Sequence, residues 1–262
     1  MPQHLISKLE HFTKLSRDDR QALENAAVKR RTFAQHSDII QEGDDPSHVN
    51  LILEGWACRY KQLDDGRRQI ISFFVPGDLC DTHIYMLREM DHSIAALTPV
   101  RLAEIPRAAL DRLTEEQPRV MKALWWDTLV SVAIQREWTV NLGQRTAIER
   151  LGHLFCELFV RLRAVGLTDG DSCPLPVTQV ELADAMGLSN VHINRTLQEL
   201  RRAGLVVFKG KRLTIPDLAA LQKASLFNPN YLHLDHEGRH LDANEPVSDR
   251  DKSASALGQE FR

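Results

Sequence analysis

The spacing of apolar residues changes along the first part of the chain. Over residues 5–27 they recur every three or four positions, and Ser16 followed by Asp19 is a helix start signal, so we predict two short helices. Over residues 32–105 they form short runs separated by turns such as Pro76-Gly77-Asp78. Short strands with turns about every 8 to 12 residues predict a small antiparallel β-roll of the jelly-roll kind.

A long helix is predicted after Pro118, because neither glycine nor proline occurs again before Gly143. Its first half is apolar on nearly every side, which requires two surfaces for burial. We assign these surfaces to the chain's own β-roll and to the same helix of a second copy. A single amphipathic core helix is the alternative. The heptad seam predicted to join two copies is Met121, Trp125, Thr128, Val132, Gln135, Thr139 and Leu142.

Two helices with a very short connection are predicted over residues 178–203. Thr178 begins a capping box that starts the first helix, and Ser189 can cap the second. The connection has the residue types that a helix-turn-helix requires: a small residue where the helices cross, a turn residue that tolerates positive φ, and an apolar residue that packs the second helix on the first. These are Ala183, Gly187 and Ile193. An ordinary helical hairpin is the alternative.

Residues 205–215 predict a β-hairpin with a basic tip, which would form the wing of a winged helix. On the second helix, the outward positions carry side chains that can read base edges, since Arg binds guanine and Asn or Gln binds adenine. The helix N-terminus can hold a phosphate. A solvated charged face is the alternative for the basic residues. The predicted DNA-contacting residues are Thr178, Ser189, Asn190, Val191, His192, Asn194, Arg195, Gln198, Lys209, Lys211 and Arg212.

Charge is unevenly distributed along the 262 residues. The net charge of −3 by itself argues against a nucleic-acid partner. However, residues 142–226 contain 11 Lys and Arg against 8 Asp and Glu, whereas the segments on either side are acidic. The basic segment is the one with the helix-turn-helix pattern. Residues 227–262 are acidic and polar, which predicts a flexible acidic tail.

Several function classes are excluded by what the sequence lacks. No apolar stretch approaches the roughly 18 residues of a membrane span, and no secretory signal is evident, so we expect a cytoplasmic protein without a membrane partner. We find no phosphate-binding glycine loop, metalloprotease helix or nucleophile elbow, so we expect no enzyme. The scattered cysteines predict reduced thiols and no metal site. They are Cys58, Cys80, Cys156 and Cys173.

The order of β-roll, long helix, hinge and winged helix-turn-helix resembles the Crp/Fnr superfamily of bacterial transcription regulators. The resemblance covers about residues 10–225 and is strongest over Thr178–Ile215 and at Pro76-Gly77-Asp78. It implies an α+β protein with a cyclic-nucleotide-binding-like β-roll, acting as a homodimer on a palindromic operator in double-stranded DNA, with RNA polymerase as a further candidate partner. The expected divisions are a sensor at 1–117, a dimerisation helix at 118–142, a DNA-binding domain at 143–226 and the tail at 227–262.

The sequence departs from the family pattern on the recognition helix. Many members begin this helix with Ser-Arg-Glu, whereas here Ser189 is followed by Asn190 and Val191. Val191 cannot accept a hydrogen bond from a cytosine amine but can contact a thymine methyl group. We therefore expect a half-site that differs from the usual one.

A second departure concerns the effector. The Glu and Arg with which cyclic-nucleotide-binding members hold ribose and phosphate are replaced by Thr82 and His92, which disfavours a cyclic nucleotide. An iron–sulfur cluster is disfavoured because such a centre would need several cysteine thiolates near the N-terminus, whereas the first cysteine here is Cys58. Haem stays open, as does thiol sensing by Cys80 or Cys156, and the cofactor is unknown. The candidate effector-pocket residues are Gly77, Asp78, Cys80, Thr82, His83, His92 and Ser93.

We interpret the sequence as an effector-responsive, DNA-binding transcription regulator. The alternative is a β-roll sensor whose C-terminal domain binds a protein partner and not DNA. The sequence leaves open the effector, the operator, the target genes, the role of the tail, and whether binding activates or represses transcription.

Overall fold

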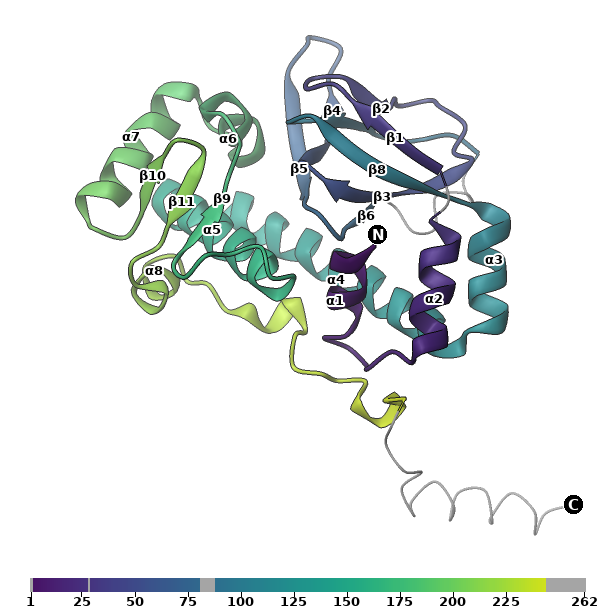
Figure 1. Cartoon of the computed structure of the whole chain (residues 1–262). Coiled ribbons are helices and arrows are strands. Elements are labelled where there is room, and N and C mark those ends of the chain that lie inside the picture. Colours follow the sequence, from purple (N-terminus) through teal and green to yellow (C-terminus); the bar gives the residue numbers. More distant parts are fainter. Residues whose placement is uncertain (1, 28, 81–87, 244–262) are drawn as a thin grey trace, which may run out of the picture.

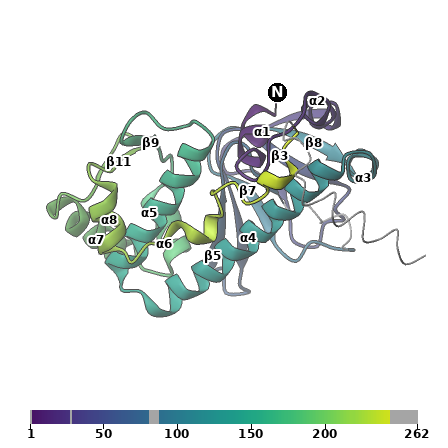
Figure 2. The same ribbon diagram turned by 90° about the horizontal axis from the view of Figure 1, so that it is seen from below.

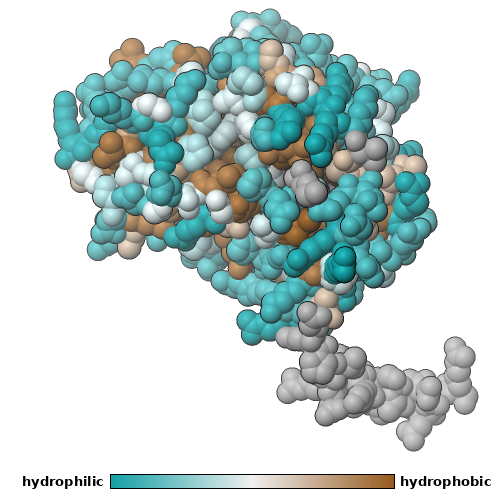
Figure 3. Space-filling model, viewed as in Figure 1, coloured by the Kyte–Doolittle hydropathy of each residue, from teal (hydrophilic) through white to brown (hydrophobic). Residues whose placement is uncertain are grey.

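The computed structural model describes residues 2–27, 29–80 and 88–243 (Figure 1). An N-terminal β-roll is joined by a long helix to a C-terminal domain of helices with a small sheet. This arrangement confirms the predicted α+β fold class with a winged helix-turn-helix. Figure 3 shows one face of the molecule, on which hydrophilic residues predominate and hydrophobic residues form smaller areas.

The β-roll consists of two four-stranded antiparallel sheets. One sheet has the order β1 (Lys29–Phe33), β8 (Val100–Pro106), β3 (His48–Glu54) and β6 (Leu79–Cys80). The other has the order β2 (Asp38–Ile40), β7 (Ser93–Ala96), β4 (Ala57–Gln62) and β5 (Arg68–Phe74). Ile52 and Leu102 from the first sheet share one buried cluster with Phe74 and Ile94 from the second, so the two sheets enclose a common core.

Three helices adjoin the β-roll: α1 (Gln3–Leu9), α2 (Arg17–Ala26) and α3 (Arg107–Glu116). The predicted start of α2 is confirmed, because Ser16 and Asp19 form a capping box with one another's backbone amides. Leu5 and Leu9 of α1 are buried in a second cluster with Leu124 of the long helix. The N-terminal helices are thus part of the packing between the β-roll and the long helix.

The long helix α4 (Pro118–Gln144) lies along the β-roll (Figure 2). Its buried side contains Trp126, Val130 and Ile134. Four apolar side chains remain exposed and follow one another along the opposite side: Trp125 (54%), Leu129 (65%), Val132 (45%) and Val140 (47%).

The predicted heptad seam is only partly the exposed stripe of α4. Trp125, Val132 and Thr139 are exposed, whereas Met121, Thr128 and Leu142 are half-buried. The assignment of Gln135 to the seam is corrected, because its side chain faces the chain's own β-roll. Its Nε2 atom donates to the carbonyl oxygen of Ile71 in β5 at 2.8 Å. Leu129 and Val140, which the heptad spacing omitted, belong to the exposed stripe.

The C-terminal domain begins with α5 (Ala147–Ala164), a helix that is buried along most of its length. A capping box of Thr146 and Glu149 starts it directly after Arg145, which ends α4. The remaining elements are β9 (Ser172–Pro174), α6 (Gln179–Met186), α7 (Asn190–Arg202), β10 (Val207–Lys209), β11 (Arg212–Thr214) and α8 (Leu218–Ala224). The strands form one antiparallel sheet in the order β10-β11-β9.

The prediction of a flexible tail is wrong for the first part of that tail. Residues 227–243 run back from α8 toward the N-terminal helices (Figure 1) and contain two 3-10 turns, η2 (Pro229–Leu232) and η3 (Arg239–Leu241). Phe227 and Leu232 are buried, and this burial, together with hydrogen bonds to residues 12–14, holds a segment whose composition is mainly polar. The remainder of the predicted tail lies outside the described residues.

Candidate nucleic-acid interface and sensor cavity

The helix-turn-helix is fixed by two caps and one left-handed glycine. The Oγ1 atom of Thr178 accepts the Glu181 amide at 3.2 Å, and the Glu181 carboxylate accepts the Thr178 amide at 2.6 Å. Gly187 has φ +62° at the end of α6, a conformation that glycine adopts without steric cost. The Oγ atom of Ser189 then accepts the His192 amide at 3.2 Å and starts α7.

One side of α7 is buried and the other is open. Ile193, Leu197 and Leu200 are buried in the domain core. The predicted DNA-contacting residues of α7 all lie on the exposed side: Asn190, Val191, His192, Asn194, Arg195 and Gln198. The Val191 side chain is 81% exposed, so it presents apolar area to water that a thymine methyl group could cover.

The polar side chains on the exposed side of α7 pair with one another in the free protein. Arg195 Nε donates to Glu199 Oε1 at 3.0 Å, and Gln198 donates to Asn194 at 2.9 Å. Asn194 in turn donates to Gln179 of α6 at 3.2 Å. These bonds are exposed, so exchanging them for bonds to bases costs little.

The wing is a two-stranded hairpin with a tight turn. Gly210 and Lys211 have φ of +60° each, which is the geometry of a type I′ turn. Lys209, Lys211 and Arg212 are all exposed on it. Arg201, which the sequence also offers for attraction to the DNA backbone, donates from Nη2 to the Phe208 carbonyl at 2.6 Å and so joins the end of α7 to the wing. Thr178 is also exposed, although its hydroxyl already serves as a cap.

The predicted effector-pocket residues do not gather in one place. Asp78 and His92 line a cavity of about 510 Å³. Gly77, with φ +98°, packs so closely on α1 that a Cβ atom would lie 2.8 Å from the His4 backbone. Cys80 is buried between the two sheets, and Ser93 Oγ accepts the Glu42 amide at 2.9 Å. Thr82 and His83 lie outside the described residues.

The cavity lies between β5, α4 and residues 232–234. Its walls are mainly apolar and include Phe74, Trp126 and Leu232, while Arg59 and His92 are polar groups in the lining. The Arg59 guanidinium lies 5.1 Å from the centre of the Phe74 ring. No local sequence signal marks Arg59 or Leu232, because each reaches the cavity only through tertiary packing.

Three of the four thiols are poor candidates for sensing. All four cysteines are buried, and burial raises the pKa of Cys58, Cys156 and Cys173 to about 12. A buried thiol with such a pKa is protonated and unreactive near pH 7.

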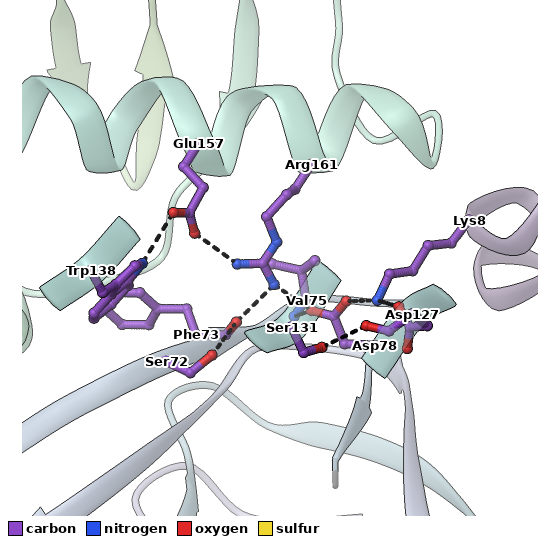
Figure 4. A network of polar contacts seen from close by, with 10 residues as sticks. All are labelled: Lys8, Ser72, Phe73, Val75, Asp78, Asp127, Ser131, Trp138, Glu157 and Arg161. Atoms are coloured by element: carbon purple, nitrogen blue, oxygen red, sulfur yellow. Dashed lines mark hydrogen bonds and ion pairs between the residues drawn. The ribbon is translucent and has the colours of Figure 1, made fainter. Parts of the chain in front are cut away.

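A buried ionic network joins the sensor to the DNA-binding domain (Figure 4). Asp78 Oδ2 accepts Arg161 Nη2 of α5 at 2.7 Å, and Asp78 Oδ1 accepts Lys8 Nζ of α1 at 2.8 Å. Lys8 also pairs with Asp127 of α4 at 2.6 Å, and Arg161 with Glu157 at 3.1 Å. Burial alone would raise the pKa of Asp78, but Lys8 and Arg161 hold that pKa below its usual value.

The helix-turn-helix also touches the sensor directly. Arg68 Nε of β5 donates to Asp184 Oδ2 of α6 at 2.9 Å, and Gln69 donates to the Ala185 carbonyl at 3.1 Å. The orientation of α6 relative to the β-roll is therefore set by specific polar contacts.

Comparison with known proteins identifies both halves of the chain. A model of the Crp-like helix-turn-helix domain matches residues 149–224, and a model of the cyclic nucleotide-binding domain matches residues 30–117. The chain belongs to the Crp/Fnr superfamily. No helix in the described part of this Crp/Fnr protein is long and apolar enough to cross a bilayer.

Individual relatives agree with this assignment. A probable transcriptional activator of Rhizobium leguminosarum bv. viciae is 28% identical over 195 residues, covering 74% of this chain and 80% of the relative. The nitrogen fixation regulation protein FixK of Bradyrhizobium diazoefficiens is 27% identical, with 74% and 81% covered. The solved structure of FixK2 from Bradyrhizobium japonicum has the same fold, with a TM-score of 0.67 at 23% identity, covering 75% of this chain and 96% of that one.

Proposed function

We propose that this Crp/Fnr protein is a homodimeric transcription regulator that reads a palindromic DNA operator with α7, under the control of an effector bound between the β-roll and α4. The observation that supports this proposal most strongly is the exposed side of α7, where six predicted DNA-contacting residues lie together beside a basic wing. A DNA-reading role would require the protein to act in the bacterial cytoplasm. The bound dimer would act by recruiting or excluding RNA polymerase.

Dimerisation is supported by the exposed stripe of α4. Exposure of large apolar side chains to water is unfavourable, and the same stripe on a second copy would cover those of α4 in a two-fold interface. The two α7 helices would then meet half-sites about one helical turn apart.

DNA reading is divided between bases and phosphates. Arg195 has the fork geometry for a guanine edge, Asn194 that for adenine, and Val191 the apolar contact for thymine. Ser189 and the amides of the first turn of α7 suit a phosphate, and Lys209, Lys211 and Arg212 would add backbone attraction.

The effector is expected to have an apolar body and a polar edge. The apolar walls of the cavity suit the body, and the Arg59 guanidinium and the His92 ring in its lining suit an acidic or hydrogen-bonding edge. His92 replaces the Arg with which cyclic-nucleotide-binding members hold the phosphate, so a permanent cation is missing at this position. The His92 Nδ1 atom lies 2.6 Å from an Asp91 carboxylate oxygen.

Selection of bound sequences from random double-stranded DNA tests the proposal. We expect enrichment of two inverted half-sites about one helical turn apart, with binding that weakens as salt rises. The absence of enrichment and of salt-dependent binding would contradict a DNA-reading role and would favour the alternative of a protein partner for the C-terminal domain.

A further inference from the structure

Residues 227–243 begin on the DNA-binding domain (Figure 1). The Phe227 ring contacts the His153 ring of α5 edge-on, with centroids 5.0 Å apart. The Tyr231 ring stacks on the same His153 ring, with centroids 5.8 Å apart. The Tyr231 hydroxyl donates to Glu157 at 3.1 Å. Glu157 is the same carboxylate that binds Arg161, so this end of the segment joins the buried ionic network.

The far end of the segment is fixed to the sensor. The Asp242 carboxylate accepts the Lys14 amide at 2.6 Å and the Thr13 hydroxyl at 3.2 Å, and it lies 2.9 Å from His236 Nε2. Although burial would raise the pKa of Asp242, the Lys14 amide and His236 hold it below its usual value. Gly238 donates its amide to the Phe12 carbonyl at 2.9 Å.

Two further features show a specific fit at this end. A Cβ atom on Gly238 would lie 2.7 Å from the Phe12 ring, so no larger residue fits there without movement. Arg119 of α4 donates to the Leu241 carbonyl at 2.7 Å, and the Ala243 amide donates to the Lys14 carbonyl at 3.2 Å. These contacts tie the segment to both the N-terminal loop and the long helix.

Between the two ends, the segment forms part of the wall of the sensor cavity. Leu232 and Leu234 line the cavity together with Trp126 of α4, and Leu232 is fully buried. An effector in this cavity would therefore touch the same segment that is fastened at both ends.

We propose that residues 227–243 form a C-terminal strap that fixes the orientation of the DNA-binding domain relative to the sensor. Along the chain, the two domains are joined at Arg145 and Thr146, and one covalent junction permits rotation. The Arg161–Asp78 and Arg68–Asp184 pairs already limit this rotation, and the strap adds an attachment between α5 and the loop after α1 that limits it further. The matched helix-turn-helix model ends at residue 224, so the strap lies beyond the family domain.

The functional consequence rests on the proposed DNA-binding function. Two recognition helices fit a palindrome only in a narrow range of relative orientations. The strap restricts the orientations that the free protein samples, so releasing it changes the fraction of molecules that are competent to bind and hence the apparent affinity.

The test compares Asp242→Ala with Arg239→Ala, a change at an exposed position of the same strap, both in the full chain. Hydrogen exchange reports the amides of Lys14, Gly238 and Ala243, and trypsin cleavage after Arg145 reports opening of the hinge. We expect Asp242→Ala to lose amide protection, to be cleaved faster after Arg145, and to bind the operator selected by the wild type with an affinity changed at least about fivefold. Arg239→Ala should match the wild type in all three measurements.

Gly238→Val is a second route to the same release, because its side chain would collide with Phe12. Urea midpoints of the variants show whether the rest of the fold is intact. If both variants lose strap protection but keep wild-type cleavage and operator affinity, the strap is only a packed tail and the proposal is overturned. If the wild type itself binds no DNA, the proposed function fails, while hydrogen exchange and proteolysis still decide whether the strap restrains the hinge.

Discussion

Asp78 in the sensor turn and Arg161 in the first helix of the DNA-binding domain form a buried ion pair, with Oδ2 and Nη2 2.7 Å apart. The same Oδ2 accepts the Val75 amide at 2.8 Å, so one carboxylate shapes the turn and holds the neighbouring domain. The turn in which Asp78 lies leads into β6, and Asp78 and Leu79 line the sensor cavity. A change in the position of this turn therefore acts directly on α5.

Removal of this carboxylate is expected to be costly. Asp78→Ala leaves Lys8 and Arg161 buried with one anion fewer, and we expect the free energy of unfolding to fall by about 3 to 5 kcal/mol in urea titrations. Asp65→Ala is the matched control, because its pair with Arg67 is exposed and the loss should be about 1 kcal/mol or less. Equal losses for the two variants would show that the buried network has no special weight.

A buried histidine predicts acid sensitivity. Burial, and secondarily the nearby Arg145, lower the pKa of His153 from 6.5 to about 3. Below pH 6.5 the His153 side chain is therefore protonated in the unfolded chain but stays neutral in the folded chain. The free energy of unfolding consequently falls as the pH falls toward 3. Between pH 7 and pH 5 this one group should remove about 2 kcal/mol.

Urea titrations at the two pH values, with His153→Gln, check this expectation. The variant should lose about 2 kcal/mol less stability than the wild type on acidification, whatever its stability at pH 7. His240→Gln, at an exposed position, should keep the wild-type pH dependence. A wild-type pH dependence in His153→Gln would contradict the assignment.

The dimer surface can be tested at its most exposed position. Leu129→Glu together with Val132→Glu would bury charge in an apolar interface, so sedimentation should show monomers. Leu63→Glu, at an exposed apolar residue of the β4–β5 hairpin, should leave the dimer intact. A monomeric variant that still bound the full palindrome with wild-type affinity would refute the proposed mode of reading.

Arg195 is expected to discriminate between bases. Arg195→Ala should weaken binding to the selected operator by about 1 to 3 kcal/mol and relax the preference at one position of each half-site, measured by fluorescence anisotropy with single-base variants. Lys209→Ala, on the wing, should instead weaken binding to all sequences about equally and reduce the salt dependence. Unchanged specificity in Arg195→Ala would remove this residue from the reading set.

The sequence by itself predicted the β-roll, the long helix, the helix-turn-helix and the wing in their order, but not α3, β9 or α8. A cap acts over three residues, so Thr178 with Glu181 and Ser189 with the His192 amide are local features whose signal lies within one short stretch. Turn residues at regular intervals likewise specify the β-roll without reference to distant contacts. The outward side of α7 followed from helical periodicity alone.

Only the tertiary structure decided which distant groups meet. Periodicity marks which residues of α4 are apolar, but whether Gln135 faces the β-roll or a partner depends on where β5 lies. The ionic network joins Lys8, Asp78 and Arg161, which stand far apart in the sequence. Residues 227–243 contain few apolar residues, and for that reason the composition suggested flexibility. In the fold, however, Phe227 and Leu232 are buried and the Asp242 carboxylate accepts the Lys14 amide. Long-range contacts of this kind are set by the packing of whole elements, and a local stretch of sequence does not contain that information.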